Sequence, residues 1–311
     1  MGSNNRKIFL AAIPDDIRSE LNRLSRHNRI YDGLTFIAVF TSFFFLMWFS
    51  DYFYNNFLSA ILFIVIQGFV LHTVAQMIHE YLVHDHFLVK YLKYPIVALV
   101  PLSPTQYNKI HIAHHKYFPN SPEDPDRAVN LPRSRLERIL AFTFLNDLLL
   151  VPRRAKFYGE PQPPVQFTPS EKKHIQFELS LFIVLVLLAI ILALVNHPVL
   201  LQGWLLPLIF GLPLFTGLRV FAEHSHVDES QPFGCGTNIR VPAILSITPY
   251  VVLFGEGHIV HHYYPHMPWY NCKKACDLLR PWMANASQKN RLFYSIWRWV
   301  QDGPHVNLSA R

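Results

Sequence analysis

Four long apolar stretches limit the folds open to this chain more than any other feature of its sequence. They cover residues 34–51, 57–78, 178–196 and 199–221. Each has 18 to 23 residues with almost no charge, and a helix of about 20 apolar residues spans the hydrocarbon core of a bilayer. Because the bilayer offers no water to unpaired backbone groups, each segment must be helical. The sequence therefore predicts an all-α integral membrane protein with four transmembrane helices.

The distribution of basic residues predicts how these helices are oriented. All 28 Lys and Arg lie before the first stretch, between the second and the third, or from Arg219 onward. The short loops 51–56 and 196–198 hold none. Cytoplasmic loops of membrane proteins carry the excess of Lys and Arg. We therefore expect both termini and the middle segment to be cytoplasmic.

The expected architecture is a single domain, residues 1–311, with two helical hairpins beneath a cytosolic helical cap. The cap comprises about residues 79–177 and 222–311. Two shorter apolar stretches, 94–103 and 241–254, contain prolines and are too short to cross a bilayer. We expect them to enter the membrane interface or to pack against the bundle.

Residues 14–30 have the pattern of an amphipathic helix, in which Ile17, Leu21 and Leu24 share one face. This helix is suited equally to a membrane surface and to ordinary packing against the protein. The formal net charge of +7 is compatible with nucleic acid or with an anionic membrane face as partner. The apolar stretches favour the membrane, so we expect no nucleic-acid partner. The three cysteines include no CxxC pair, and we expect neither a disulfide framework nor a cysteine metal site.

Histidine is the unusual residue of this chain, with 17 copies, most of them in four clusters. The first contains His79, His84 and His86; the second His111, His114 and His115; the third His224 and His226; the fourth His258, His261 and His262. In the expected topology all four clusters lie on the cytosolic side of the membrane, at similar depth.

The spacing HxxHH occurs twice, in the second and fourth clusters, and it has a physical meaning. Residues i, i+3 and i+4 share one face of a helix, with Cβ atoms about 5–6 Å apart. Their imidazoles can therefore converge on one or two metal ions. Buried polar groups without partners each cost about 1–3 kcal/mol, and metal ligation removes that cost. Neutral imidazole suits iron, zinc and copper alike, so the donors alone do not identify the metal.

Two clusters leave the choice of ligand open. His79 and His84 are five residues apart, off a common helical face, whereas His79 and His86 are seven apart and share one. His226 is a similar alternative beside His224. Isolated histidines are more often ordinary hydrogen-bonding groups, and we interpret the remaining copies in this way. These are His27, His72, His174, His197, His266 and His305.

Acidic residues stand beside the histidine clusters. They are Glu80, Asp85, Asp124, Asp126, Glu223 and Glu256. Histidines that bind a metal usually donate their second N–H to a carboxylate or a carbonyl. We therefore expect these carboxylates to orient the ligands rather than to bind the metal, except that Asp85 is as well explained as a solvated surface charge.

These motifs, in this order, resemble the membrane fatty acid desaturase superfamily, which includes related hydroxylases and ketolases. The resemblance runs from about residue 35 to residue 280. The matching residues are His79 and His84; His111, His114 and His115 with Asp124, Pro125 and Asp126; Glu223 and His224; Thr237 and Asn238; and His258, His261 and His262 with Tyr263, Tyr264, Pro265, Pro268, Trp269, Tyr270 and Asn271.

The resemblance implies four spans under a cytosolic cap, with two iron ions held by histidines. It favours His84 over His86 and adds His224. The implied ligand set is His79, His84, His111, His114, His115, His224, His258, His261 and His262. Dioxygen is implied as the co-substrate. Because the sequence lacks the haem motif of a fused cytochrome b5 domain, we expect electrons from a separate carrier: ferredoxin, rubredoxin or cytochrome b5.

The reaction we expect first is the introduction of a double bond into a fatty-acyl or lipid-like chain. Glu223-His224 and the fourth cluster followed by Tyr-Tyr-Pro resemble bacterial acyl desaturases. The expected membrane is the bacterial inner membrane or the endoplasmic reticulum, and the compact chain without the fused domain favours the former. The alternative is a hydroxylase or ketolase, of the alkane monooxygenase or carotenoid ketolase type, because Pro268-Trp269-Tyr270 resembles ketolases. A zinc-dependent membrane hydrolase needs only about three protein ligands, and nine clustered histidines are too many for it.

Overall fold

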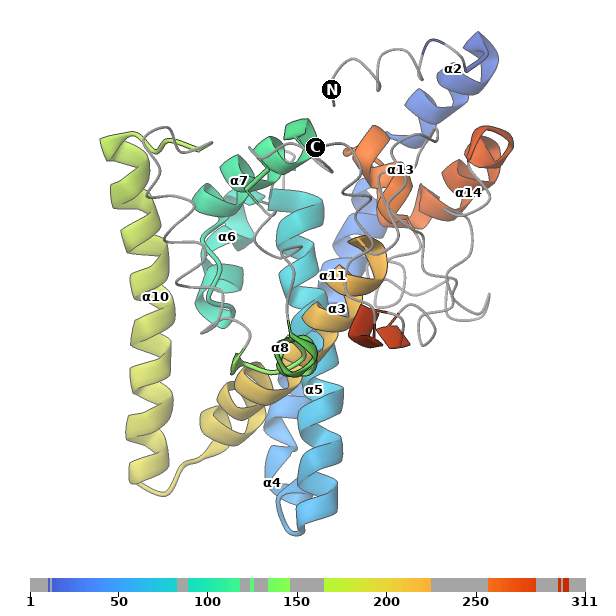
Figure 1. Ribbon diagram of the computed structural model, residues 1–311. Helices are drawn as coiled ribbons and strands as arrows, with labels where there is room; N and C mark the ends of the chain where they lie inside the picture. The colour runs from blue at the N-terminus through green and yellow to red at the C-terminus, as the bar shows by residue number, and fades with distance from the viewer. Residues whose placement is uncertain are drawn as a thin grey trace.

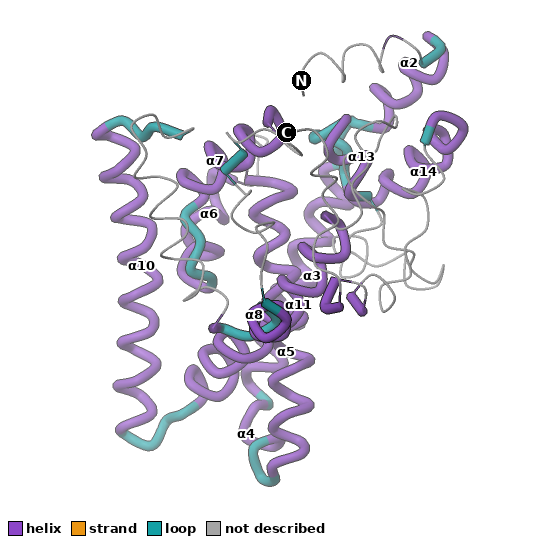
Figure 2. Tube along the Cα trace, viewed as in Figure 1, coloured by secondary structure: helices purple, strands orange, loops and turns teal. Residues whose placement is uncertain are grey.

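In the computed structural model the described part of the chain is built from helices, with no strand among the residues it describes (Figure 2). These residues are 11, 13–82, 89–117, 124–125, 134–145, 165–224, 257–283, 296–297 and 299–301. Four helices are long and apolar enough to cross a membrane: Arg29–Trp48, Phe57–Tyr81, Pro169–Leu194 and Leu201–Val220. The expected all-α fold with four candidate spans is confirmed.

The first hairpin consists of α3 (Arg29–Trp48) and α5 (Phe57–Met77), joined through the short helix α4 (Ser50–Phe53). Each long helix begins after an asparagine whose side chain accepts a backbone N–H from the first turn, Asn28 for α3 and Asn56 for α5. The cap at Asn28 explains why α3 begins before residue 34, where the apolar stretch starts. The first turn of α3 includes the charged residues Arg29 and Asp32, and the side chain of Asn28 accepts the backbone N–H groups of Ile30 and Tyr31.

The third candidate span, α10 (Pro169–Leu194), begins nine residues before the predicted start at residue 178. The signal missed in the sequence is a capping box, in which Thr168 and Glu171 each accept the other's backbone N–H. After α10 the chain turns at Asn196, whose φ of 64° is left-handed. Asparagine is among the few residues that tolerate this conformation at a helix end.

The fourth candidate span is not a regular α-helix along its whole length. It begins with two π-helical turns, η3 (Leu201–Leu205) and η4 (Pro207–Gly211), and continues as α11 (Leu212–His224). The proline at the start of η4 has no N–H to donate, so it cannot complete a regular α-helical ladder.

Different elements lie at the two ends of the long helices (Figure 1). Helix α4 and the turn that follows α10 lie at the lower end of the view. Helices α7 (Pro104–Tyr117), α13 (His258–Tyr263) and α14 (Trp269–Leu279) lie at the opposite end. Two further short helices of the described part are α8 (Arg135–Leu140) and η6 (Arg280–Trp282). This arrangement matches two hairpins beneath a helical cap.

The short apolar stretch 94–103 packs against the bundle, which was one of the two arrangements expected from the sequence. Most of it lies in α6 (Val89–Leu99), which contacts α10 and α5. Ile96 is fully buried, and the indole Nε1 of Trp204 donates to the carbonyl oxygen of Leu99 at 2.8 Å. The second short stretch, 241–254, lies outside the described residues.

The N-terminal amphipathic helix packs on the protein, which decides between its two interpretations. It is α2 (Asp15–Leu24), shorter than the predicted 14–30 because a separate helix starts at Arg29. Leu21 and Leu24 are buried in one cluster with Ala275 and Leu279 of α14. The apolar face of α2 is therefore covered by protein.

Two glycines allow α5 and the fourth span to approach closely. A Cβ atom added to Gly68 of α5 would overlap the backbone at Gly211 of η4. One residue away, the side chain of Gln67 donates to the carbonyl oxygens of Phe43, at 3.2 Å, and Gly203, at 2.8 Å. Small residues commonly permit such contacts between membrane helices. This crossing joins three of the four spans.

We predict that Gly68→Val lowers the stability of the folded protein by about 1–3 kcal/mol, because the added atoms force two backbones apart. Thermal unfolding of the purified protein in detergent measures the effect. Gly33→Ala is the matched control, since nothing lies within 4 Å of an added Cβ there. Equal unfolding midpoints for Gly68→Val and the parent would contradict the packing described.

Candidate metal centre

The first histidine cluster lies where α5 changes its winding. Helix α5 is followed by one π-helical turn, η1 (Ile78–Leu82), which carries His79 and Glu80. A π-turn inside a helix redirects the side chains that follow it and is frequent at functional sites. The side chain of His79 is buried, with 8% of its surface exposed. The other two histidines of this cluster, His84 and His86, lie outside the described residues.

The second and fourth clusters lie on short helices of the cap. Helix α7 carries His111, His114 and His115, and α13 carries His258, His261 and His262. All of these rings are buried except that of His115, which is half-buried. The HxxHH spacing thus places three rings on one face of each helix, as the sequence indicated, and the two helices turn these faces toward each other.

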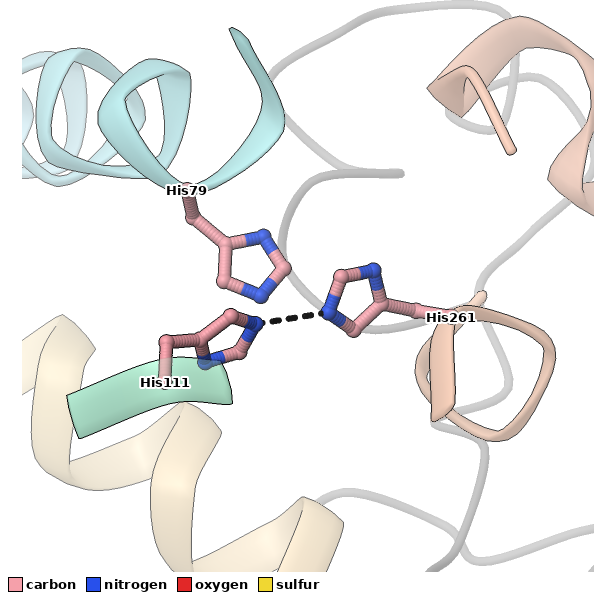
Figure 3. Close-up of side chains that lie close together, drawn as sticks. All are labelled: His79, His111 and His261. Carbon is pink, nitrogen blue, oxygen red and sulfur yellow. Dashed lines mark hydrogen bonds between the residues drawn. The ribbon is translucent and has the colours of Figure 1, made fainter. Parts of the chain in front are cut away.

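Ring nitrogens from three separate segments converge in one place (Figure 3). Donor atoms of His79, His111 and His261 lie within 4.8 Å of one another, in a grouping that could hold a metal ion. The Nε2 atom of His115 lies 2.8 Å from that of His111 and 2.9 Å from that of His261. The Nε2 atoms of His111 and His261 are 3.0 Å apart.

A second group of rings adjoins the first. The Nε2 atoms of His258 and His262 are 3.1 Å apart. The ring of His262 lies 4.7 Å from that of His115 and 5.4 Å from that of His114, centroid to centroid. The described rings therefore form two neighbouring groups, which meet where the ring of His262 lies beside that of His115.

Hydrogen bonds alone cannot satisfy the triangle of His111, His115 and His261. Each Nε2 carries either one proton or one lone pair, so at least one of the three contacts sets two donors or two acceptors against each other. A cation would accept all three lone pairs. Nitrogens bound about 2.1 Å from one ion at right angles stand about 3 Å apart, which is the spacing found. The donor set fits a metal ion.

The surroundings of His261 favour the form of the ring that binds metal. Burial lowers the pKa of His261 well below its usual value, and the neighbouring His79 and His115 lower it further. A neutral imidazole has a free lone pair, whereas a protonated one does not. The environment of His261 therefore favours the neutral ring, which can bind a metal ion.

Two of the expected carboxylates contact histidines of the cap. The Nδ1 atom of His114 lies 3.0 Å from Oδ1 of the buried Asp124. The Nδ1 atom of His258 lies 3.2 Å from Oε2 of Glu223, whose other oxygen accepts from Arg219 at 2.9 Å. The Nε2 atom of His258 is left to face that of His262.

Burial raises the pKa of Glu223 to about 7, against the opposing effect of Arg219. Three further acidic residues beside the clusters, Asp85, Asp126 and Glu256, lie outside the described residues. His224 ends α11, and its side chain is not described.

Glu80 has a different partner from the one its position beside His79 suggests. Its Oε1 atom accepts the backbone N–H of Trp269, at 2.8 Å. The indole Nε1 of Trp269 in turn donates to Oγ1 of Thr35 in α3, at 3.2 Å. Trp269 thus links the helix after the fourth cluster both to the first cluster and to the first span.

Two of the isolated histidines that the structure describes lie beside polar groups outside the four clusters. The Nδ1 atom of His27 lies 3.2 Å from a carboxylate oxygen of Asp32, and that of His72 lies 3.4 Å from the hydroxyl of Thr216. The other three, His174, His197 and His266, are exposed.

Sequence reasoning missed one buried polar group close to these elements. Glu178 lies in the third candidate span, 1% exposed, and bonds to residues at the start of α7. Its signal in the sequence is a single acid in the run Phe177-Glu178-Leu179, at the start of an otherwise apolar segment.

We predict that the hydrogen bond between Trp269 and Thr35 couples the two side chains by about 0.5–1.5 kcal/mol. A double-mutant cycle of Trp269→Phe and Thr35→Val, read as unfolding free energies in detergent, isolates this term. Trp297→Phe with Thr35→Val is the control, since Trp297 is 63% exposed, and its coupling should be near zero. Two equal couplings would show that the indole bond contributes nothing specific.

Comparison with known proteins agrees with this geometry. No curated protein matches the chain. The family model described as fatty acid desaturase matches residues 56–295, which is well over half of the chain and includes all nine histidines of the expected ligand set. That family consists of membrane oxidoreductases of the desaturase and hydroxylase type and is iron-dependent. The chain belongs to the fatty acid desaturase family.

Proposed function

We propose that this protein uses dioxygen and a histidine-bound di-iron centre to introduce a double bond into a fatty-acyl or lipid-like chain. The observation that carries the proposal is the convergence of buried imidazoles from η1, α7 and α13 at one end of an apolar helical bundle. The family match supports the same reaction class.

The two neighbouring groups of rings suggest how two ions would be shared. His79, His111, His115 and His261 form the first group, and His258 and His262 form the second, with His114 beside His262. We propose His84 and His224 as additional ligands on the basis of the sequence motifs. Asp124 and Glu223 would hold two of the rings in place through their Nδ1 atoms.

Bound iron would supply dioxygen activation and the oxidation of a C–H bond. The protein's part is to hold the rings neutral and oriented and to keep water out, which burial of six of the seven described ligands achieves. Overall, the chain –CH2–CH2– and O2, with two electrons and two protons, give –CH=CH– and two molecules of water. The substrate loses two hydrogens, and the external electrons complete the reduction of O2.

The electrons require a donor, which we propose to be a separate ferredoxin, rubredoxin or cytochrome b5. The metal centre, both termini and the cap would face the cytoplasm, because the short loops at the other end hold no Lys or Arg. The substrate would come from the bilayer that surrounds the four apolar helices, and the membrane would be the inner membrane of a bacterium.

A hydroxylase or ketolase is the second candidate, on the strength of one observation. Trp269, in the Pro-Trp-Tyr stretch that resembles ketolases, donates its backbone N–H to Glu80, the residue that follows His79 in η1. Both reactions begin with removal of hydrogen from a methylene, and they differ in whether a second hydrogen is lost or oxygen is added. The same ligand geometry is compatible with either outcome.

The isotope content of the product separates the two reactions. We expect lipids from cells that express the protein under 18O2 to contain a new species two mass units lighter, without 18O. A product that carries one 18O atom would replace the desaturase proposal with the hydroxylase. Cells with the His111→Ala variant provide the background.

We predict that His111→Ala and His261→Ala each lower bound iron and reduce product formation by more than about 100-fold, since even partners of metal ligands contribute about 10–100-fold. Iron per chain and lipid analysis measure the two effects. His197→Ala, in the exposed loop at the opposite end, should keep both. Full turnover in either of the first two variants would remove that histidine from the ligand set.

A further inference from the structure

Glu178 is a buried carboxylate in a helix that is otherwise largely exposed. Of the residues in α10, only Glu178 and Ala189 are buried. Glu178 is the tenth of the 26 residues of α10, in the half that begins at the same end of the molecule as α7 (Figure 1). Burying a charged group is costly unless it is paired and hydrogen-bonded, so its partners explain why it is there.

Four donors surround the Glu178 carboxylate. Oε1 lies 2.5 Å from Nζ of Lys93 in α6 and accepts from the hydroxyl of Thr105 at 2.8 Å. Oε2 accepts from the hydroxyl of Ser103 at 2.5 Å and from the backbone N–H of Thr105 at 3.2 Å. The hydroxyl of Ser103 also accepts the backbone N–H of Gln106, at 3.1 Å.

These contacts place a negative charge at the N-terminus of α7. The first backbone N–H groups of a helix have no partner within it, and an acidic group there is favoured by the helix dipole. Ser103 and Glu178 together satisfy the amides of Gln106 and Thr105. The first turn of the cap helix α7 is therefore held by a residue of the third candidate span, α10.

The position of α7 matters because it carries the second histidine cluster. His111 lies six residues after Thr105, about 9 Å along a helix that rises 1.5 Å per residue. The Nε2 contacts of His111 and His115 with His261 are 2.9 to 3.0 Å long. A slide of α7 by one ångström would open or close these contacts, so the triangle depends on how the helix is anchored.

A second ion pair between α7 and α10 allows a comparison with the contacts of Glu178. Nζ of Lys109 lies 2.7 Å from Oε2 of Glu171, one turn along α7 and toward the start of α10. Both side chains are about one-third exposed. Exposed ion pairs of this kind add little to stability, which makes this pair the matched control for Glu178.

We propose that Glu178 is a positioning residue, which fixes the N-terminus of α7 and so sets the distance between the second histidine cluster and the other rings. A buried ion pair is weak evidence of stability, because apolar residues of similar volume often serve as well or better. Fixing the position of α7 is therefore a better explanation for a buried charge at Glu178 than added stability. This inference rests on the proposed metal centre.

The test compares Glu178→Leu, Lys93→Met/Glu178→Gln and Glu171→Gln, titrated with ferrous iron in detergent without oxygen. Leucine keeps the segment apolar but leaves Ser103 and the amide of Thr105 without their acceptor. Glutamine still offers an oxygen to both, and methionine removes the cation that would otherwise lack its partner. We expect iron affinity to fall by about 10–100-fold in Glu178→Leu, and to stay within about threefold in the other two.

Hydrogen exchange of the metal-free protein separates a failed inference from a failed metal assignment. We expect amides of the first two turns of α7 to exchange faster in Glu178→Leu than in Glu171→Gln, while those of α14 do not change. Parent protein that binds no iron would refute the proposed function. Loss of α7 protection would still support the positioning role, and unchanged protection in α7 would overturn it.

A variant on the other side of the contact keeps the test decisive if Glu178→Leu does not fold. Ser103→Ala/Thr105→Val removes both hydroxyl donors and leaves the ion pair with Lys93 intact. It should lower iron affinity in the same direction as Glu178→Leu. A folded form of either variant that binds iron as the parent does would refute the inference.

Discussion

The constraint on which this structure depends is the placing of many imidazole rings in a buried site at the end of an apolar bundle. Each ring nitrogen has one proton or one lone pair to satisfy, and little water is available to do so. The three Nε2 atoms of His111, His115 and His261 cannot satisfy one another. A metal ion resolves this conflict, and the chain is arranged so that the lone pairs meet.

Three elements bring the rings together, and none of them fixes the site alone. The π-turn η1 carries His79. The other rings are carried by α7 and α13, short cap helices of 14 and 6 residues. Helices this short gain little stability by themselves and depend on packing. Longer elements provide it: α10 reaches α7 through Glu178, and α14 reaches the first cluster through the bond of Trp269 to Glu80. The short elements that carry the histidines are held in position because they are bonded to other helices, α10 and α14.

Patterns local in the sequence predicted the fold well. Apolar length identified four candidate spans, and the HxxHH spacing placed three rings on one face of both α7 and α13. Helix starts were missed where a cap extends a helix into polar residues, as at Asn28 and Thr168. The contacts of Glu178 with Ser103 join residues 75 positions apart, and no periodicity contains that information. The π-turn at His79 is also invisible to a pattern that assumes regular helices.

The family match begins at residue 56, yet residues before it are bonded to α14, the helix that follows the fourth histidine cluster. Thr35 in α3 accepts the indole N–H of Trp269, and the backbone N–H of Asn28 donates to the hydroxyl of Tyr270 at 2.5 Å. The side chain of Asn271 donates to the carbonyl oxygen of Leu24 at 2.7 Å. Three consecutive residues of α14 are thus bonded to the N-terminal segment. The matched region contains the clustered histidines, and the segment outside it helps to hold α14, so the two parts form one structural unit.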